Sequence, residues 1–196
     1  MTFPNLLIIG IAVLGVVSAT NVTKVELTGN CNITELIYAL SCAQTMKDFK
    51  DRMSPSTLSN TTELSEFKGS CATLEKCHTT IGHCPPFGTN ETHKAFRTIT
   101  SYCGVINTVA DNLLEYGDLL EKDEVSKKCY NEWKPFLKAG DEAKDKTETC
   151  KNFFGKDQCM KISIIKHCGQ ENWEKFRDAF IELNNAVQQC DLSNVL

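Results

Sequence analysis

The stretch that decides the fold is residues 94–120, which read KAFRTITSYCGVINTVADNLLEYGDLL. Apolar or small residues recur in it every three or four positions over about seven helical turns. They are Phe96, Ile99, Cys103, Ile106, Ala110, Leu113, Gly117 and Leu120. An α-helix repeats every 3.6 residues or so, which places these side chains on one face. The spacing predicts a single long amphipathic helix.

The same period recurs on both sides of this helix, and no run of β-branched residues alternates as a half-buried strand would. A second stripe, which Gly82 closes, consists of Leu64, Phe67, Cys71, Leu74, His78 and Ile81. A last stripe consists of Trp173, Phe176, Phe180, Leu183 and Val187. Shorter helices are expected after Asp123, around Cys150 and over about 157–168. The sequence therefore predicts an all-α, disulfide-cross-linked bundle of about six to seven helices.

The segment before Pro55 has apolar residues on two faces. One face carries Ile33, Leu36, Ile37 and Leu40, and a nearly opposite face carries Cys42, Met46, Phe49 and Met53. A helix with this pattern is expected to be buried on two sides or bent.

The N-terminus has the features of a cleavable secretory signal. An unbroken run of apolar or glycine residues extends from Leu6 to Val17, and small residues precede a cleavage point after Ala19. The run spans only about 18 Å, too short for a bilayer core of about 30 Å. We expect residues 1–19 to be removed and residues 20–196 to form one extracellular domain without a membrane span. Its 21 basic and 25 acidic residues are interspersed, which argues against nucleic acid as a partner.

Eleven cysteines indicate an oxidising compartment, because paired thiols persist only where cytosolic reductants are absent. The chain also carries four Asn-x-Thr acceptors for N-glycosylation, at Asn21, Asn32, Asn60 and Asn90. Both features predict a secreted glycoprotein.

The C-terminal third carries a recognisable cysteine pattern. Residues 150–161 read CKNFFGKDQCMK, residues 168–177 read CGQENWEKFR, and residues 133–136 read WKPF. With these motifs the chain resembles a family of secreted cysteine-rich domains expanded in nematodes, domain of unknown function nineteen, over about residues 31–190. The resemblance implies an extracellular helical, disulfide-bonded module and brings no activity, substrate or cofactor. The family pattern has twelve cysteines, and Tyr116 stands where this chain departs from it.

That departure predicts which thiol is unpaired. If the long helix turns back near residues 121–123, positions 116 and 129 face each other, so Cys129 is the predicted free thiol. The other ten cysteines are then in disulfides: Cys31, Cys42, Cys71, Cys77, Cys84, Cys103, Cys150, Cys159, Cys168 and Cys190. Helix-hairpin spacing offers the pairs Cys71–Cys103, Cys31–Cys84 and Cys42–Cys77. Cys150–Cys159 could clip the turn at Gly155, and Cys168 and Cys190 are left unplaced.

Local motifs also offer a metal site and a catalytic pair as alternatives. Cys77, His78, His83 and Cys84 suit zinc by ligand type, but disulfides and a packed histidine are the favoured reading in an oxidising compartment. A nucleophilic Cys129 with His93 or His167 as base has no supporting signature. No catalytic, metal or cofactor site is therefore predicted, and Trp133 and Trp173 are expected in the core.

Two functional classes remain. The first is a non-enzymatic binding module that engages another extracellular protein or receptor. The alternative is a carrier of a small apolar ligand or lipid, as in saposin-like domains. We favour the first, because the charged surface shows no lipid-facing side and long stripes usually form core.

Overall fold

The computed structural model describes residues 31–52, 61–84, 87–113, 115–116, 119, 122–136 and 143–193. The fold is all-α, as predicted, and none of these residues forms a strand. The helices are α2 (Ile33–Arg52), α3 (Thr61–Ile81), α4 (Asn90–Asn112), α6 (Glu124–Glu132), α7 (Ala143–Lys151), the short 3-10 helix η3 (Lys156–Gln158), α8 (Cys159–Cys168) and α9 (Gln170–Val187).

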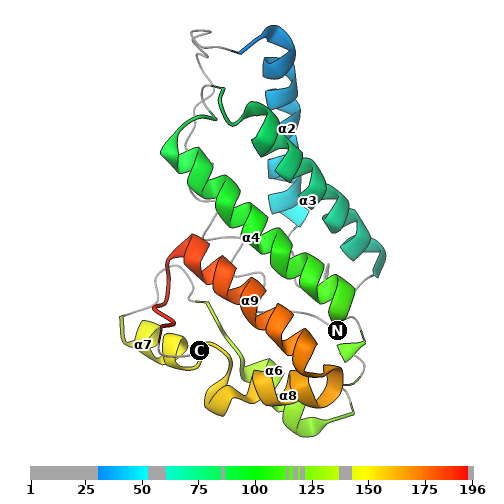
Figure 1. The fold of residues 1–196 in the computed structure, drawn as a ribbon, viewed down its shortest axis with the longest axis vertical. Coiled ribbons are helices and arrows are strands. Elements are labelled where there is room, and N and C mark those ends of the chain that lie inside the picture. Colours follow the sequence, from blue (N-terminus) through cyan, green and yellow to red (C-terminus); the bar gives the residue numbers. More distant parts are fainter. Residues whose placement is uncertain are drawn as a thin grey trace.

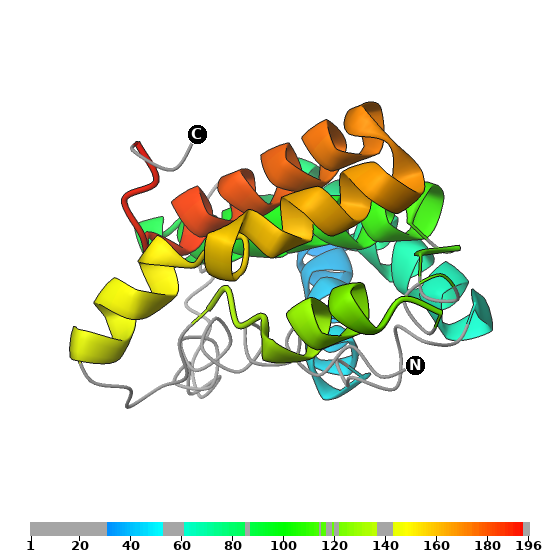
Figure 2. The same cartoon turned by 90° about the horizontal axis from the view of Figure 1, so that it is seen from below.

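Helix α4 is the element that both halves of the molecule share. It packs against α3 on one side and against α9 on the other, and α3 in turn packs on α2 (Figure 1). Seen from below, α8 lies between α9 and α6 (Figure 2). The N-terminal half therefore consists of α2, α3 and α4, and the C-terminal half of α6 to α9.

The buried faces of α3, α4 and α9 are those predicted from the spacing. Phe67, Leu74 and Ile81 of α3 are buried, and so are the predicted positions of α4 from Phe96 to Ala110. On α9 the same holds for Trp173, Phe176, Phe180 and Leu183. The prediction that the tryptophans belong to the core is confirmed, since Trp133 and Trp173 are 4% and 3% exposed.

Seven buried aromatic side chains pack against one another in the C-terminal half, and we call them the aromatic cluster. They are Trp133, Phe136, Phe153, Phe154, Trp173, Phe176 and Phe180. The indole Nε1–H of Trp133 donates to the carbonyl of Phe153 at 2.8 Å, which satisfies the one polar group of that ring system.

Helix α4 ends earlier than predicted. Its C-cap is Leu113, and the Leu113 N–H donates to the Val109 carbonyl. Tyr116 is nonetheless buried, because a turn in which its N–H donates to the Leu113 carbonyl keeps it on the core side. Apolar spacing alone cannot distinguish such a turn from another helical turn. Gly117 and Leu120 lie outside the described residues.

Five disulfides tie the helices together. Three of them are the pairs predicted from hairpin spacing: Cys31–Cys84, Cys42–Cys77 and Cys71–Cys103. The other two are Cys129–Cys159 and Cys150–Cys190. The predicted clip between Cys150 and Cys159 is therefore wrong, because each of these cysteines pairs with a different helix or chain end.

The assignment of Cys129 as the free thiol is also wrong. Cys129 is bonded to Cys159, and Cys168 is the free cysteine among the described residues. The error follows from the early end of α4, which removes the assumed symmetric hairpin between positions 116 and 129. Val125, one helical turn before Cys129, is 79% exposed.

Helix α2 corrects a further expectation. Its second apolar face is buried, with Ala39, Cys42, Met46 and Phe49 packed in the core; Met53 lies outside the described residues. On the first face, Leu36 is half-buried, whereas Ile33, Ile37 and Leu40 are exposed to solvent.

Candidate functional site

The outer face of α2 exposes three large aliphatic side chains in a row. Ile33, Ile37 and Leu40 are 77%, 64% and 67% exposed. Their i, i+4, i+7 spacing places them on one face along about 10 Å of helix. We call these three residues the α2 stripe. Scattered exposed aliphatics are ordinary, but adjacent ones on a single helix face are typical of a binding surface.

The helix that carries the stripe is firmly held. Cys31–Cys84 fixes the N-terminal end of α2, and Cys42–Cys77 joins its middle to α3. Its first turn is closed by a capping box: the Asn32 side-chain oxygen accepts from the Glu35 N–H, and the Glu35 carboxylate accepts from the Asn32 N–H, both at 2.9 Å. The stripe is therefore a fixed surface of the molecule.

Two of the four predicted glycosylation positions lie in the described residues. Asn32 is exposed, and its cap uses only the side-chain oxygen, which leaves the amide nitrogen free of that bond. Asn90 is exposed at the first position of α4, where Thr89 is the N-cap. Asn21 and Asn60 lie outside the described residues, as does the predicted signal segment.

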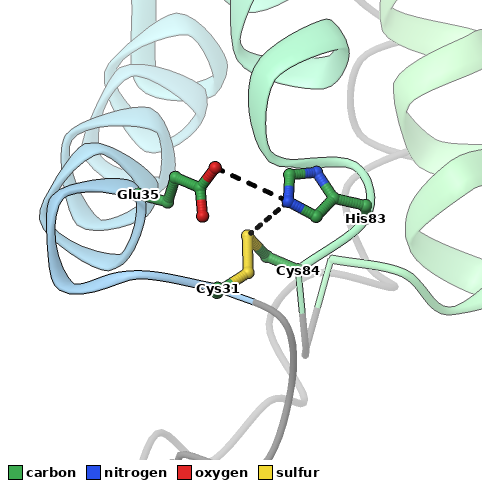
Figure 3. A group of neighbouring side chains, drawn as sticks. All are labelled: Cys31, Glu35, His83 and Cys84. Carbon is green, nitrogen blue, oxygen red and sulfur yellow. Dashed lines mark hydrogen bonds and ion pairs between the residues drawn. A yellow bond between two sulfur atoms is a disulfide. The ribbon is translucent and has the colours of Figure 1, made fainter.

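The residues considered as zinc ligands separate in the structure. Cys77 pairs with Cys42, while His78 lies against Phe96 and its Nε2 is 3.2 Å from Nδ1 of His93. Burial and the neighbouring His93 lower the pKa of His78. His83 and Cys84 instead meet Cys31 and Glu35 at the N-terminal end of α2 (Figure 3). Of the four residues considered as zinc ligands, only His83 and Cys84 stay together.

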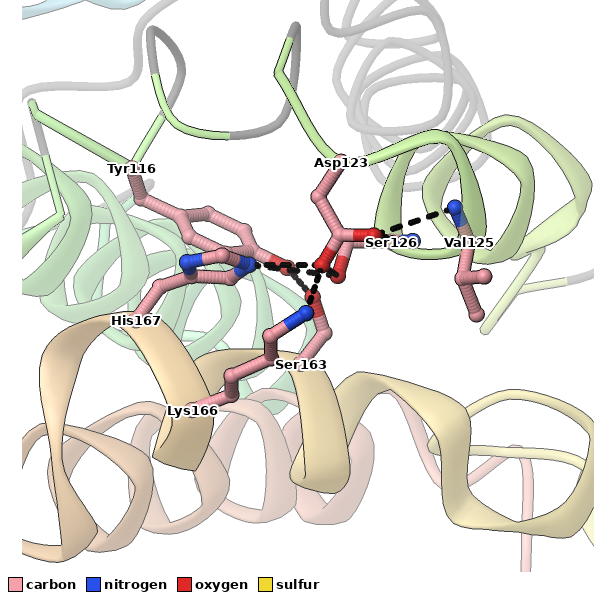
Figure 4. Close-up of polar contacts among 7 residues, drawn as sticks. All are labelled: Tyr116, Asp123, Val125, Ser126, Ser163, Lys166 and His167. Atoms are coloured by element: carbon pink, nitrogen blue, oxygen red, sulfur yellow. Dashed lines mark hydrogen bonds and ion pairs between the residues drawn. The ribbon is translucent and has the colours of Figure 1, made fainter.

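A polar cluster that sequence reasoning missed joins α6 to α8 (Figure 4). The carboxylate of Asp123 caps α6, as predicted, and also accepts from His167 Nε2 at 2.9 Å and from Lys166 Nζ at 2.5 Å. Ser126 Oγ donates to the same carboxylate at 2.9 Å. The hydrogen bonds that the Asp123 carboxylate accepts from Lys166, His167 and Ser126 hold the pKa of Asp123 well below the usual range of an aspartate.

The cluster contains an acid, a histidine and a serine, but not in the arrangement of a catalytic triad. Asp123 and Ser126 both approach Nε2 of His167, at 2.9 and 3.4 Å. A triad needs the acid on one ring nitrogen and the nucleophile on the other. The observed contacts instead make a latch between the start of α6 and the end of α8.

The free Cys168 lies near Tyr116, the position where this chain departs from the family pattern. Burial raises the pKa of Tyr116 to about 12 against the opposing effect of its hydrogen bond to Ser163, and Cys168 and Asp123 raise it further. Burial and Glu115 raise the pKa of the Cys168 thiol. Cys168 is thus a half-buried, poorly ionised thiol next in sequence to His167, whose ring lies against Tyr116.

A cleft of about 260 Å³ lies beside the Cys129–Cys159 disulfide. Charged side chains line much of it, namely Glu132, Lys134, Glu148 and Lys156. Such a lining does not suit an apolar ligand. None of the helices in the described ranges has the length and apolarity needed to cross a membrane.

These features define an all-helical module cross-linked by disulfides. The comparisons identify it further: residues 31–191 match the family model described as "Domain of unknown function (DUF19)", and the chain belongs to that family. It is similar to three proteins of Caenorhabditis elegans. "Excretory canal abnormal exc-13" is 34% identical over 97% of this chain and 97% of its own length.

The other two relatives belong to a group named UPF0376. "UPF0376 protein C36C5.12" is 32% identical over 99% of this chain and 91% of its own length. "UPF0376 protein F10G2.1" is 33% identical over 98% of each chain. No solved structure matches the chain. The family and its relatives carry no named activity, so the function must be argued from the surface.

Proposed function

We propose that this protein is a secreted, N-glycosylated, non-enzymatic binding module that docks onto another extracellular protein through the α2 stripe. The observation that carries the proposal is the exposure of Ile33, Ile37 and Leu40 on one face of a helix held by two disulfides. Burying a large aliphatic side chain contributes about 1.5–3 kcal/mol, so covering the stripe is favourable.

Secretion is supported by the signal-like N-terminus and by the disulfides. Five disulfides in one small domain are stable in an oxidising compartment and would be reduced in the cytosol. The four Asn-x-Thr acceptors fit the same compartment.

The spacing of the stripe indicates what kind of surface it fits. Anchors at i, i+4 and i+7 are those of a helix that lies in the hydrophobic groove of a partner. Glu35 is the one charged residue between Ile33 and Met46, so this part of α2 enters an apolar groove without burying several charges. We therefore assign the stripe to a partner protein with such a groove.

A second copy of this chain fits less well. A standard interface uses about 20–30 residues on each side, and the stripe supplies three. Two stripes paired antiparallel would add only the same three residues again. A groove that covers the exposed face of α2 and the surface beside it supplies the missing area.

The test uses two substitutions of matched chemistry. Ile37→Glu places a charge in the centre of the stripe, while Val125→Glu places one at an equally exposed aliphatic position of α6. Loss of a central anchor costs about 2 kcal/mol or more, so Ile37→Glu should weaken binding by about thirtyfold. Val125→Glu should bind like the wild type, and both variants should melt at the wild-type temperature.

Binding is measured with immobilised mature glycoprotein and the extracellular fluid of the source organism, followed by titration of the recovered partner. Equal losses for Ile37→Glu and Val125→Glu would overturn the docking site. A homodimer in light scattering that dissociates on Ile37→Glu would assign the stripe to a second copy and equally reject the heterologous partner.

A further inference from the structure

The residues at the N-terminal end of α2 bring four metal-ligating groups together (Figure 3). Cys31 and Glu35 come from the start of α2, and His83 and Cys84 follow the end of α3. One ligand atom of each residue lies within 4.8 Å of the other three. Within the described residues, these four side chains form the one cluster of three or more potential metal ligands. We call it the Cys31 group.

Its composition suits zinc. Two thiolates, an imidazole and a carboxylate are all ligands that Zn²⁺ accepts in tetrahedral sites. With bonds of about 2.0–2.3 Å, neighbouring ligand atoms in a tetrahedron lie about 3.3–3.8 Å apart. Nε2 of His83 is already 3.6 Å from a Glu35 carboxylate oxygen and 3.8 Å from Sγ of Cys84.

The surrounding contacts hold these groups in place. One carboxylate oxygen of Glu35 accepts the Asn32 N–H, and the other faces His83. The Cys84 N–H donates to the Ile81 carbonyl at 2.9 Å, which fixes the turn that presents His83 and Cys84. His83 is exposed and Cys31 is half-buried, whereas Cys84 is buried, so a reductant and an ion reach the site from the side of Cys31 and His83.

In the structure the two sulfurs are bonded to each other and cannot act as thiolates. We propose that reduction of the Cys31–Cys84 disulfide converts the Cys31 group into a zinc site with Cys31, Cys84, His83 and Glu35 as ligands. This inference goes beyond the proposed function and does not depend on it.

The chemistry balances with one reductant, a dithiol. The dithiol transfers two electrons and two protons, the bond between the sulfurs of Cys31 and Cys84 breaks, and the dithiol closes to its own disulfide. Zn²⁺ then displaces the two thiol protons to solvent and forms two bonds to sulfur. His83 donates its Nε2 lone pair, and Glu35 donates one carboxylate oxygen.

The test uses the mature protein, partially reduced with a dithiol that is then removed, and Co²⁺ as a spectroscopic probe for Zn²⁺. The reduced protein should bind one Co²⁺ per chain with sulfur-to-cobalt charge-transfer absorption, and Zn²⁺ should abolish the band. The oxidised protein should show no such band. His83→Gln should weaken Zn²⁺ binding by about tenfold or more, whereas His78→Gln should leave it unchanged.

The Cys150–Cys190 disulfide is the matched control, because the reductant has similar access to it. Cys150 and Cys190 are also half-buried, so the same reductant reaches them. Replacing both by Ser should leave the cobalt band intact, whereas replacing both Cys31 and Cys84 by Ser should remove it. Retention of the band after the latter change, or its absence from the reduced wild type, would overturn the proposal.

One variant tests the site without any reductant, in case reduction unfolds the chain. Cys31→His prevents the disulfide and leaves Cys84, His83 and Glu35 beside a new imidazole. It should bind Zn²⁺ in the otherwise oxidised protein, as followed by displacement of a chromophoric chelator. Helical circular dichroism verifies the fold, and a folded Cys31→His protein that binds no Zn²⁺ counts against the geometry.

Discussion

Three disulfides link α2, α3 and α4, whereas seven interlocking aromatic rings fill the space between the helices of the C-terminal half. The N-terminal helices are 20–23 residues long, and small residues such as Cys42, Cys71 and Cys103 make up part of their buried faces. The C-terminal helices are shorter but bury large rings. A cysteine buries less area than an aromatic ring, and its covalent bridge contributes stability that aromatic packing contributes in the C-terminal half.

The largest effect should come from reducing the disulfides. Each native disulfide in a small secreted domain contributes about 2–5 kcal/mol, and three of the five lie in the N-terminal half. Reduction should therefore abolish amide-exchange protection in α2 and α3 before it does so in α8 and α9. Hydrogen exchange resolved by peptide mass spectrometry checks the order. Earlier loss in α9, or an unchanged melting temperature, would contradict the contrast between the halves.

The next largest effect should come from truncating the aromatic cluster. Phe180 is 1% exposed and its ring contacts Trp133, Phe136 and Phe176. Phe180→Ala should lower the free energy of unfolding by about 3–5 kcal/mol.

Phe67 is the matched control, because it is equally buried but lies in the N-terminal half beside the bridge of Cys71. Phe67→Ala should cost less than Phe180→Ala, since the bridge keeps α3 on α4 when the ring is lost. Urea denaturation of both variants gives the comparison. Equal losses of unfolding free energy in the two variants would mean that the Cys71–Cys103 disulfide does not compensate for a lost ring.

A sixth bridge should stabilise the C-terminal half. The ring centroid of Tyr116 is 6.2 Å from that of His167, the residue before the free Cys168, so Tyr116→Cys should form a disulfide with Cys168. The gain should be about 2–4 kcal/mol relative to Tyr116→Ser, because both variants lose the buried tyrosine ring.

Alkylation before reduction, under denaturing conditions, follows the bond directly. The wild type should label at Cys168, Tyr116→Cys should label at no cysteine, and the control Tyr116→Ser should label like the wild type at lower stability. A label on Cys129 of the wild type would reverse the assignment of the free thiol.

The smallest effect should come from the latch between α6 and α8. Asp123→Asn retains an N-cap but removes the charge that faces Lys166 and His167. Because the folded protein lowers the pKa of Asp123, the carboxylate stabilises the fold above the usual carboxyl pKa of about 4. That contribution is lost as the pH falls through the lowered pKa.

The melting temperatures of wild type and Asp123→Asn should therefore differ at pH 7 and converge in acid. A difference that persists unchanged at the lowest pH at which both proteins fold would show that the charge is not the stabilising element.

The pattern of apolar residues was sufficient where one helix face meets the core. The buried positions of α3 and α9 follow from the spacing, and three disulfides follow from helix hairpins, because residues equidistant from a turn lie opposite each other. The pairs of the C-terminal half did not follow. Cys129 and Cys150 bond to cysteines that lie beyond an intervening helix or glycine turn. Equal distance from a single turn does not predict pairs of this kind.

The candidate site was visible in the sequence but was assigned to the core. Ile33, Ile37 and Leu40 have the spacing of a buried face, and spacing does not tell whether the chain itself or another molecule covers that face. The latch at Asp123 and the Cys31 group bring together residues about 40 to 50 positions apart. Such clusters depend on how the helices pack, which local sequence motifs do not specify.

The attachment of α2 determines how the molecule responds to a pull. A tensile load applied at the α2 stripe passes to α3 through two covalent linkages, one at the start of the helix and one at its middle. Non-covalent packing alone would let the helix peel away one turn at a time. With both bridges closed, peeling requires breaking a sulfur–sulfur bond, so an anchored chain resists shear at this surface until a reductant releases the helix.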